Sequence, residues 1–332
     1  MEKKVCCFGE LLFRISPDNN FLQNNIMPFY AGGAELNAAT ALANWNIPVQ
    51  YITALPNNYL SKNVVQYIEQ KGIDSSSIIF TGDRIGIYYL PFGSELKNEG
   101  VIYDRSNSSF AGLMPGEIDW DTLLVNCSWF HFSAISAALH LNVAAVCKEA
   151  VEAAARKGIP ISIDLNYRAK LWQYGVDPVS IMPDLLKHCT VIMGNIWAVK
   201  SLLGIPSKIE NSNNKTEEQL IDAAEDCILQ LQKQYPKAIT LAFTYRLQNC
   251  YFTILQHLNK QFVSKKYDIS IVVDKVGSGD CFMAGLIYGL YKGKSASDII
   301  EFATAAAVLK LAEAGDATKQ TIENINKKII SE

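Results

Sequence analysis

The sequence lacks any hydrophobic run long enough to cross a membrane. Its most apolar stretch, residues 281–291, has only 11 residues and contains two glycines, whereas a membrane-spanning helix needs about 20 predominantly apolar residues. Near the N-terminus, the short apolar run at residues 5–8 is interrupted at once by Gly9 and Glu10, which is too early for a secretory signal. We therefore expect a cytoplasmic protein without a membrane partner.

The chain also lacks an excess of charge of either sign. Its 332 residues include 30 Lys and Arg against 33 Asp and Glu, which gives a net charge of −3 at pH 7. Binding to nucleic acid or to an anionic membrane depends on a clustered excess of positive charge. The content of 49% hydrophobic and 19% charged residues excludes a disordered chain. We expect a protein that acts on small molecules and has no nucleic-acid partner.

Patterns typical of disulfide frameworks and metal sites are missing as well. The chain has no C-x-x-C pair, and its four histidines show neither H-E-x-x-H nor another ligand spacing. Scattered cysteines in a long chain without a signal sequence favour free buried thiols. We expect no residue of the chain to bind a metal ion directly. The eight cysteines are Cys6, Cys7, Cys127, Cys147, Cys189, Cys227, Cys250 and Cys281.

Strand-like and helix-like runs alternate along most of the chain. This alternation is typical of a parallel sheet wrapped by helices. We predict a single doubly wound α/β domain over residues 1–332, with a mostly parallel sheet flanked by helices. The predicted strands are 5–8, 49–53, 129–132, 160–164, 191–194 and 238–244, and the predicted helices are 34–45, 61–71, 142–157, 196–203 and 216–234.

Two early insertions break this alternation. Residues 12–30 and 85–110 contain short β-rich runs without a helical run that could cross between parallel strands. In the second insertion, the runs at 87–90 and 101–103 are joined across an expected turn at Gly93-Ser94. We expect the two insertions to form a small β-sheet lid over one edge of the main sheet.

The most informative segment is residues 271–290, I-V-V-D-K-V-G-S-G-D-C-F-M-A-G-L-I-Y-G-L. A β-rich run leads into a glycine turn that opens an apolar helix. Outward-pointing amides at Gly277 and Gly279, together with the positive end of the helix dipole, predict an anion site. Asp280 would repel a phosphate there, unless it accepts a proton from a hydroxyl that attacks the phosphate. The alternative is a plain loop in which Asp280 stabilises the first helical turn.

The same segment matches the signature D-x-x-G-x-G-D at Asp274, Gly277, Gly279 and Asp280. With this signature the chain resembles the ribokinase-like carbohydrate kinases of the PfkB family, which implies a ribokinase-like fold and the use of ATP with Mg²⁺. In that family the counterpart of Asp280 is the catalytic base that activates the sugar hydroxyl. The resemblance assigns Gly277, Ser278 and Gly279 to the anion hole for the transferring phosphoryl group.

An earlier segment supports the same resemblance. A-G-G-A-E-L-N-A-A at residues 31–39 matches the paired glycine and downstream asparagine that open an early helix in these kinases. The resemblance therefore assigns Gly33 and Asn37 to the sugar. The two motifs occur in the order of the family, so the resemblance covers nearly the whole chain.

Further segments are similar to those of 2-keto-3-deoxygluconate kinases within the family. They are G-E at 9–10, G-I-Y at 86–88, Y-D-R at 103–105 and D-L-N-Y-R at 164–168, and they assign Tyr88, Tyr103, Arg105 and Arg168 to the substrate. Guanidinium groups suit the carboxylate of a keto-deoxy sugar acid. We expect transfer of the γ-phosphoryl group of ATP to the terminal hydroxyl of 2-keto-3-deoxygluconate or a similar sugar acid. The alternative acceptors are a neutral sugar, such as fructose or ribose, and a nucleoside.

The nucleotide side departs from the family pattern. The family motif N-x-x-E becomes N-I-W-A at residues 195–198, so Ala198 replaces a glutamate, and T-x-G becomes T-Y-R at residues 244–246. These departures leave open a weakened relative that binds a sugar acid without phosphorylating it. The residues assigned to the nucleotide are Asn195, Thr244, Arg246, Gly277 and Gly279.

The resemblance also bears on assembly. Lid sheets in this family often pair between subunits, and an exposed face with Tyr88 or Tyr89 and Phe92 would suit such a contact. We expect a homo-oligomer assembled through the lid.

Overall fold

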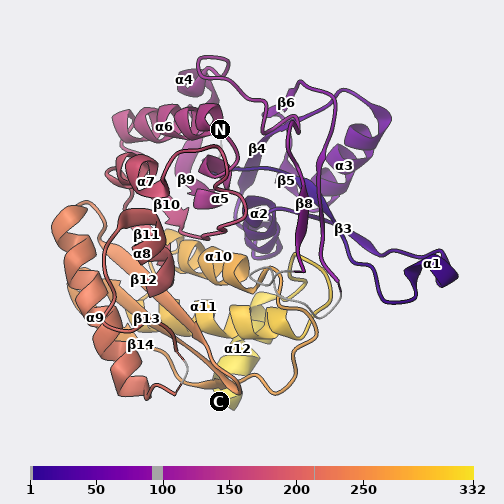
Figure 1. The fold of residues 1–332 in the computed structure, drawn as a ribbon. Coiled ribbons are helices and arrows are strands. Elements are labelled where there is room, and N and C mark those ends of the chain that lie inside the picture. Colours follow the sequence, from indigo (N-terminus) through magenta and orange to yellow (C-terminus); the bar gives the residue numbers. More distant parts are fainter. Residues whose placement is uncertain (1–2, 92–99, 213) are drawn as a thin grey trace.

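The computed structural model describes residues 3–91, 100–212 and 214–332, and its centre is a large, mostly parallel sheet (Figure 1). In spatial order the main path of strands is β14 (Lys260–Val263), β13 (Cys250–His257), β12 (Thr240–Arg246), β11 (Val191–Gly194), β10 (Ile161–Asp164), β9 (Cys127–Ser133), β1 (Lys4–Phe8), β4 (Val49–Leu55) and β5 (Ile73–Asp74). Two short strands lie beside this path, β6 (Ile78–Phe80) on β4 and β15 (Tyr267–Asp268) on β13.

The strand order creates a crevice at one end of the sheet. β1 pairs in parallel with β4 on one side and with β9 on the other, and β9 to β12 continue the parallel pairing. The chain therefore leaves β1 in one direction and later returns to its opposite side. Loops that follow the strands diverge at such a switch point, and α/β proteins bind ligands in the crevice between them.

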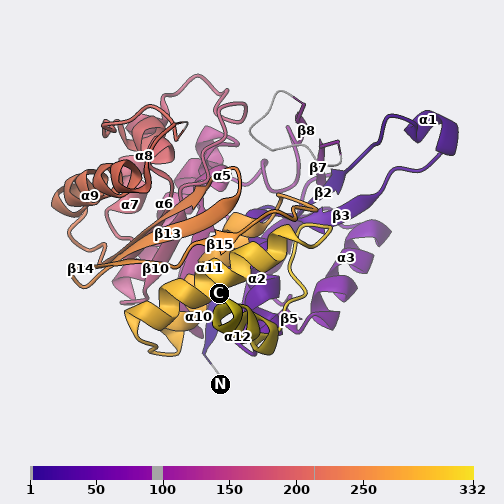
Figure 2. The same ribbon diagram turned by 90° about the horizontal axis from the view of Figure 1, so that it is seen from below.

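Helices cover both faces of the sheet, as the doubly wound prediction requires (Figure 2). One layer consists of α2 (Ala34–Asn44), α3 (Tyr59–Gln70), α10 (Ser278–Tyr291), α11 (Ala296–Leu311) and α12 (Ile322–Ser331). The other consists of α4 (Trp120–Leu123), α5 (Ala134–Ala137), α6 (Leu141–Arg156), α7 (Pro178–Leu186), α8 (Ile196–Leu203) and α9 (Glu217–Gln234). The strands and helices predicted from the sequence are confirmed, with ends shifted by a residue or two.

The predicted separate sheet is also confirmed. Its order is β3 (Phe29–Gly32), β2 (Leu12–Ile15), β7 (Gly86–Tyr89) and β8 (Ile102–Asp104), and all four strands come from the two insertions. The connection between β2 and β3 carries the short α1 (Phe21–Asn24), which projects from the body in Figures 1 and 2. The expected turn at Gly93-Ser94 and the side chain of Phe92 lie outside the described residues.

The β-rich run before the glycine turn forms no strand, and the side chain of Ile271 is 72% exposed. The amides of Val273 and Asp274 donate instead to the carbonyl oxygen of Leu311, over 2.8 and 3.1 Å. Because the end of α11 takes these donors, the chain passes along the helix and does not join the sheet.

The cysteines behave as predicted. All eight thiols are free, and all except that of Cys250 are buried. Burial raises the pKa of thiols such as Cys147 and Cys189 above the usual range, so they stay protonated.

In the described parts of the chain, no helix is both long and apolar enough to span a bilayer.

Close packing of α10 against α11 fixes the start of α10 in the crevice. A Cβ atom at Gly285, in the middle of α10, would lie only 2.5 Å from the Cα atom of Ala303 in α11. The absence of a side chain at Gly285 therefore allows the two helix backbones to approach each other. Since α10 begins at Ser278, this contact sets the position of the glycine turn.

Candidate active site

A cavity of about 590 Å³ occupies the crevice at the carboxyl ends of the parallel strands. The main sheet, the small sheet and the start of α10 all contribute to its wall. Every site residue predicted from the sequence lines it, although their individual roles stay predictions. These residues are Gly33, Asn37, Tyr88, Tyr103, Arg105, Arg168, Asn195, Thr244, Arg246, Gly277, Ser278, Gly279 and Asp280.

The glycine turn has the geometry of an anion site. Gly277 has a φ of +81° and precedes the first residue of α10, and a Cβ atom there would lie 1.8 Å from the carbonyl oxygen of Asp316. Only glycine fits this position. A Cβ atom at Gly279 would meet no other atom within 4 Å, so open space lies over the amides at the positive end of α10. A phosphate group fits that space and its donors.

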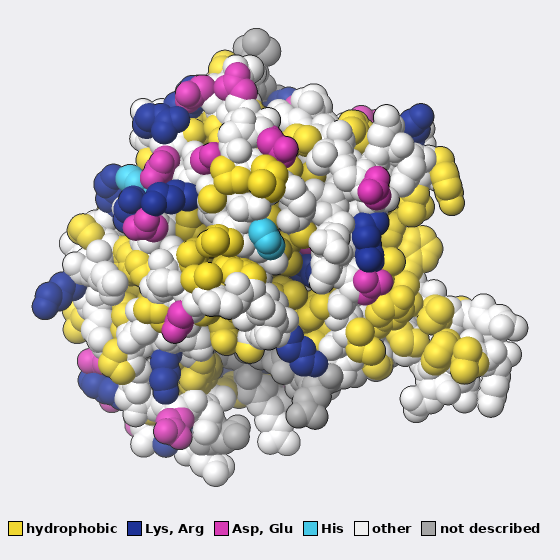
Figure 3. Space-filling model, turned by 45° about the horizontal axis from the view of Figure 1, so that its top comes forward, with side chains coloured by type: hydrophobic (Ala, Val, Ile, Leu, Met, Phe, Trp, Pro, Cys, Tyr) yellow, Lys and Arg dark blue, Asp and Glu magenta, His cyan; other side chains and the backbone are white. Residues whose placement is uncertain are grey.

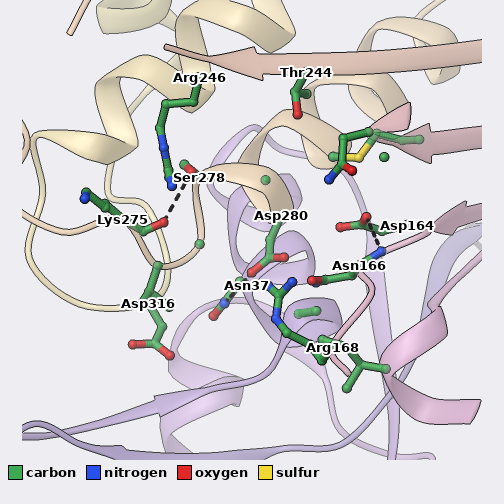
Figure 4. Close-up of a pocket in the computed structure, with 18 of the residues that line it drawn as sticks. Asn37, Asp164, Asn166, Arg168, Thr244, Arg246, Lys275, Ser278, Asp280 and Asp316 are labelled. Carbon is green, nitrogen blue, oxygen red and sulfur yellow. Dashed lines mark hydrogen bonds between the residues drawn. The ribbon is translucent and has the colours of Figure 1, made fainter. Parts of the chain in front are cut away.

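Asp280 lies in the first turn of α10, beside the anion site (Figure 4). The Nδ2 atom of Asn37 donates to Oδ2 of Asp280 over 2.7 Å. Burial, and the neighbouring charge of Asp164, raise the pKa of Asp280 to about 7, although Asn37 and Arg168 act in the opposite direction. A carboxyl group with this pKa can accept a proton near neutral pH.

A second buried carboxyl group lies on α2, two residues before Asn37. Glu35 is only 2% exposed, and burial raises its pKa to about 7. The charge of Asp280 adds to this increase. Glu35 was not predicted as a site residue, because a single glutamate in the first turn of a helix is usually a dipole partner.

The two arginines predicted to bind substrate differ in their surroundings. Arg105 donates through Nε to the Oε2 atom of Glu10 over 2.7 Å, and its Nη2 contacts the same oxygen. Ser108 donates to the other oxygen of Glu10. The Glu10 side chain is therefore the partner of Arg105, which the sequence analysis did not foresee.

The charge of Arg168 acts on the carboxyl group of Asp280. Its positive charge lowers the pKa of Asp280, and it also opposes the burial that raises the pKa of Tyr103. One guanidinium nitrogen donates to the carbonyl oxygen of Tyr167 over 3.0 Å, which fixes the side chain beside β10. In Figure 4 the guanidinium of Arg168 lies next to Asp280 and Asn37.

The opposite end of the cavity carries two further cations. Arg246 extends from the end of β12 toward Ser278 in Figure 4, and Lys275 also lines the cavity. The hydroxyl of Ser278 donates to the carbonyl oxygen of Lys275 over 3.3 Å. Lys275 was not predicted as a site residue, because the variable positions of a signature give no signal in one sequence.

Asn195 and Asp316 complete the wall. The side chain of Asn195 caps α8, accepting the amide of Ala198 over 2.9 Å, so its NH₂ group is the part left for a ligand. Asp316, in the loop after α11, was also missed by the sequence analysis. It accepts the hydroxyl of Tyr88 over 3.1 Å. The side chain of Tyr88 is only 5% exposed, so of the two alternatives for an exposed subunit contact, Tyr88 and Tyr89, Tyr88 is excluded.

Comparison with known proteins places this site in a family. The profile described as pfkB family carbohydrate kinase matches residues 2–323. The chain is 22% identical to a 2-dehydro-3-deoxygalactonokinase of Haloferax volcanii, over 98% of this chain and 96% of that protein.

Solved structures give the same result. The crystal structure of 2-dehydro-3-deoxygluconokinase from Thermotoga maritima is 30% identical and covers 99% of this chain and 100% of that chain, with a TM-score of 0.89. A fructokinase with bound ATP from Xylella fastidiosa is 18% identical, covers 100% and 99% of the two chains with a TM-score of 0.79, and shares the fold. The predicted ribokinase-like fold is thus confirmed, and the chain belongs to the pfkB family of carbohydrate kinases.

Proposed function

We propose that this carbohydrate kinase transfers the γ-phosphoryl group of ATP to the terminal primary hydroxyl of 2-keto-3-deoxygluconate or a similar sugar acid. The observation that carries the proposal is that Asp280 and Arg168 line the same cavity, next to an anion site, where the charge of Arg168 acts on Asp280. A base, a cation for a carboxylate and a cradle for phosphate are the three parts that this reaction needs. The names of the Thermotoga and Haloferax relatives support the same substrate class.

Groups of the cavity account for each part of the phosphoryl transfer. Asp280 accepts the proton of the sugar hydroxyl while the hydroxyl oxygen forms a bond to the γ-phosphorus of ATP. The bond between the γ-phosphorus and the bridging oxygen of the β-phosphate breaks, and ADP is released. The amides of the turn at residues 277–279 stabilise the charge that develops on the transferring group. Because Asp280 is held by Asn37, its free oxygen can meet the hydroxyl in a fixed direction.

The triphosphate of ATP fits between the anion site and the cations of Arg246 and Lys275, which line the same cavity. Mg²⁺, which neutralises phosphate charge when it accompanies ATP, prefers oxygen ligands. Although no direct metal ligand is expected from the sequence, the carboxylate of Asp164 lines this cavity and would hold the ion together with the phosphates. In the described parts of the chain, no cluster of three or more His, Cys, Asp or Glu side chains is arranged for a metal ion.

The sugar-acid carboxylate is assigned chiefly to Arg168. Arg105 already neutralises the buried carboxylate of Glu10, so its charge is balanced without a substrate. Arg168, next to Tyr103, offers the remaining predicted guanidinium. A sugar acid offers this guanidinium a carboxylate, whereas fructose, ribose and a nucleoside offer it no anionic group, which favours the sugar acid.

The small sheet is assigned the role of a lid. Tyr88 and Tyr103, on β7 and β8, bring it against the same cavity that Asp280 lines. Closure of this sheet over the sugar would keep water away from the γ-phosphate and favour transfer to the sugar.

Consumption of ATP also supports the cytoplasmic location expected from the sequence.

Replacement of the base gives the first test. Asp280→Asn should lower kcat by at least about 100-fold, because the amide cannot accept the proton. The thermal midpoint should not fall, since burial disfavours the charged form of this group. Rates of ADP release with 2-keto-3-deoxygluconate and calorimetric unfolding measure the two effects. Asp222→Asn, an exposed change on α9, is the matched control, and near-normal turnover of Asp280→Asn would contradict the assignment.

Replacement of the cation tests the substrate class. Arg168→Ala should raise the KM for the sugar acid by about 10- to 100-fold, the scale of a charge-assisted hydrogen-bond pair. The KM for ATP should change by less than about twofold, because Arg168 is assigned to the sugar end. Steady-state kinetics with a panel of sugar acids, fructose and ribose measures this. The exposed Arg156→Ala on α6 is the control, and equal effects on both KM values would remove Arg168 from the sugar site.

The pH dependence follows from the sign of the shift at Asp280. Burial raises its pKa to about 7, so the base is lost by protonation below that pH. In initial-rate measurements, kcat/KM for the sugar acid should fall about tenfold per pH unit well below pH 7. Glu35→Gln should keep this acid limb, although the pKa of Glu35 is also about 7. A flat profile, or loss of the limb in Glu35→Gln, would exclude Asp280 as the titrating base.

We also infer a homo-oligomer that pairs through the lid. Phe29 on β3 is 66% exposed and Ile102 on β8 is 62% exposed, and hydrophobic side chains gather over this sheet and the projecting α1 segment in Figure 3. Light scattering on a sizing column should give a mass above 36.8 kDa for the natural protein. Phe29→Asp and Ile102→Asp should reduce it, while the exposed Ile330→Asp on α12 should not. A monomeric natural protein would contradict this inference.

A further inference from the structure

A buried ion network joins the small sheet to the anion site. Arg14, on β2, is only 2% exposed. Its Nη1 and Nη2 atoms donate to the two carboxylate oxygens of Asp274 over 3.1 and 2.6 Å. Its Nε atom lies 2.8 Å from Oδ1 of Asp316 and forms an ion pair with it. This contact is not a hydrogen bond, and neither atom has a hydrogen-bond partner among the described residues. One side chain of the small sheet thus contacts two carboxylates from different loops.

Asp274 is the first residue of the signature that ends at the catalytic base. Its carboxylate also accepts the amide of Val276, over 3.1 Å, and the amide of Gly315, over 3.1 Å. The first of these contacts shapes the chain that enters the anion site. The second holds the loop after α11 against it, so Asp274 ties both segments together and Arg14 holds Asp274.

Asp316 completes the connection on the other side of the anion site. Its carbonyl oxygen packs against Gly277, while its carboxylate lines the cavity and accepts the hydroxyl of Tyr88. The ion pair with Arg14 therefore acts on a residue that touches both the phosphate end and the lid. A displacement of β2 would move Asp274 and Asp316 together.

We propose that Arg14 is a positioning residue which keeps the anion site and the carboxylate of Asp316 aligned with the small sheet. This inference rests on the proposed kinase reaction. Among the described residues that line the cavity, Arg14 is absent, so it acts through Asp274 and Asp316 and not on the substrate itself. The consequence is that closure of the lid and formation of a competent anion site are coupled.

Arginine is suited to this task by its shape. Three of its donor nitrogens face two carboxylates, whereas the ammonium of lysine is a single point charge. The guanidinium carbon also lies 4.5 Å from the centre of the Tyr30 ring on β3, which adds a second strand of the small sheet to the contact. Buried ion pairs contribute little to stability compared with well-packed apolar residues, so stability alone does not account for Arg14.

Kinetics of Arg14→Lys and Arg14→Met test the proposal. Both variants should lower kcat by at least tenfold, with the KM for ATP changed less than twofold, because a misplaced anion site loses transition-state stabilisation more than ground-state binding. Arg84→Lys is the control, since Arg84 pairs with Asp104 on β8 over 2.8 Å but is 39% exposed. It should keep kcat within twofold.

The fraction of protein molecules that bind nucleotide separates a positioning role of Arg14 from a role in folding. Titration calorimetry with a non-hydrolysable ATP analogue counts the sites, and a purely structural role would lower that count and the thermal midpoint without changing kcat per site. Unchanged kcat per site in Arg14→Lys would overturn the proposal. Arg14→Lys keeps a positive charge beside Asp274 and Asp316. The buried Lys310, near Gly277, is present in both variants, so a second positive charge remains close to these carboxylates and limits the loss of stability.

Hydrogen exchange on the natural protein gives a measurement that needs no variant and no sugar. Binding of the ATP analogue alone should slow exchange of the amides at residues 12–15 of β2 at least threefold, because Arg14 ties β2 to the anion site. Absence of slowing would overturn the coupling. Failure of the proposed function has a different signature, since the natural protein would then phosphorylate no sugar acid while the exchange result could still be obtained.

Discussion

The site depends on one electrostatic conflict, a carboxylate buried next to a cradle for anions. Asp280 lies at the positive end of α10, where amides and helix dipole favour a phosphate, and burial keeps its pKa near 7. A charged aspartate would repel the phosphate, whereas a protonated one could not act as a base. A pKa close to the working pH satisfies both requirements, and Asn37 and Arg168 prevent burial from raising it further.

Charge pairing around the cavity extends this balance outward. The chain has a net charge of −3, and its cavity wall carries both signs. The cations are Arg105, Arg168, Arg246 and Lys275, and the acidic residues are Glu10, Glu35, Asp164, Asp280 and Asp316. The buried carboxylates of Glu10, Asp274 and Asp316 each contact an arginine of the small sheet or of the loop after it. Those arginines are neutralised by the protein, which leaves the recognition of ligand anions to other cations.

Sequence patterns predicted the parts of the fold and site that repeat or match a motif. The alternation of strands and helices and the separate sheet follow from periodicity, whereas the residues of the early glycine motif follow from the resemblance to the PfkB family. Glu10, Lys275 and Asp316 line the cavity but are single residues in connecting segments, where no period identifies them. The apolar run before the glycine turn has a β-like composition but forms no strand, because the end of α11 takes its amide donors.

The departures on the nucleotide side do not remove the case for catalysis. Ala198 lacks the carboxylate of the family motif, but its amide is held by the Asn195 cap, so the local backbone is still anchored. A protein that only bound a sugar acid would gain from an amide in place of Asp280, because a neutral side chain avoids both desolvation and repulsion of phosphate. Retention of a buried, titratable carboxyl group next to an anion site is therefore physically costly unless the group moves a proton, which favours an active kinase over a binding-only relative.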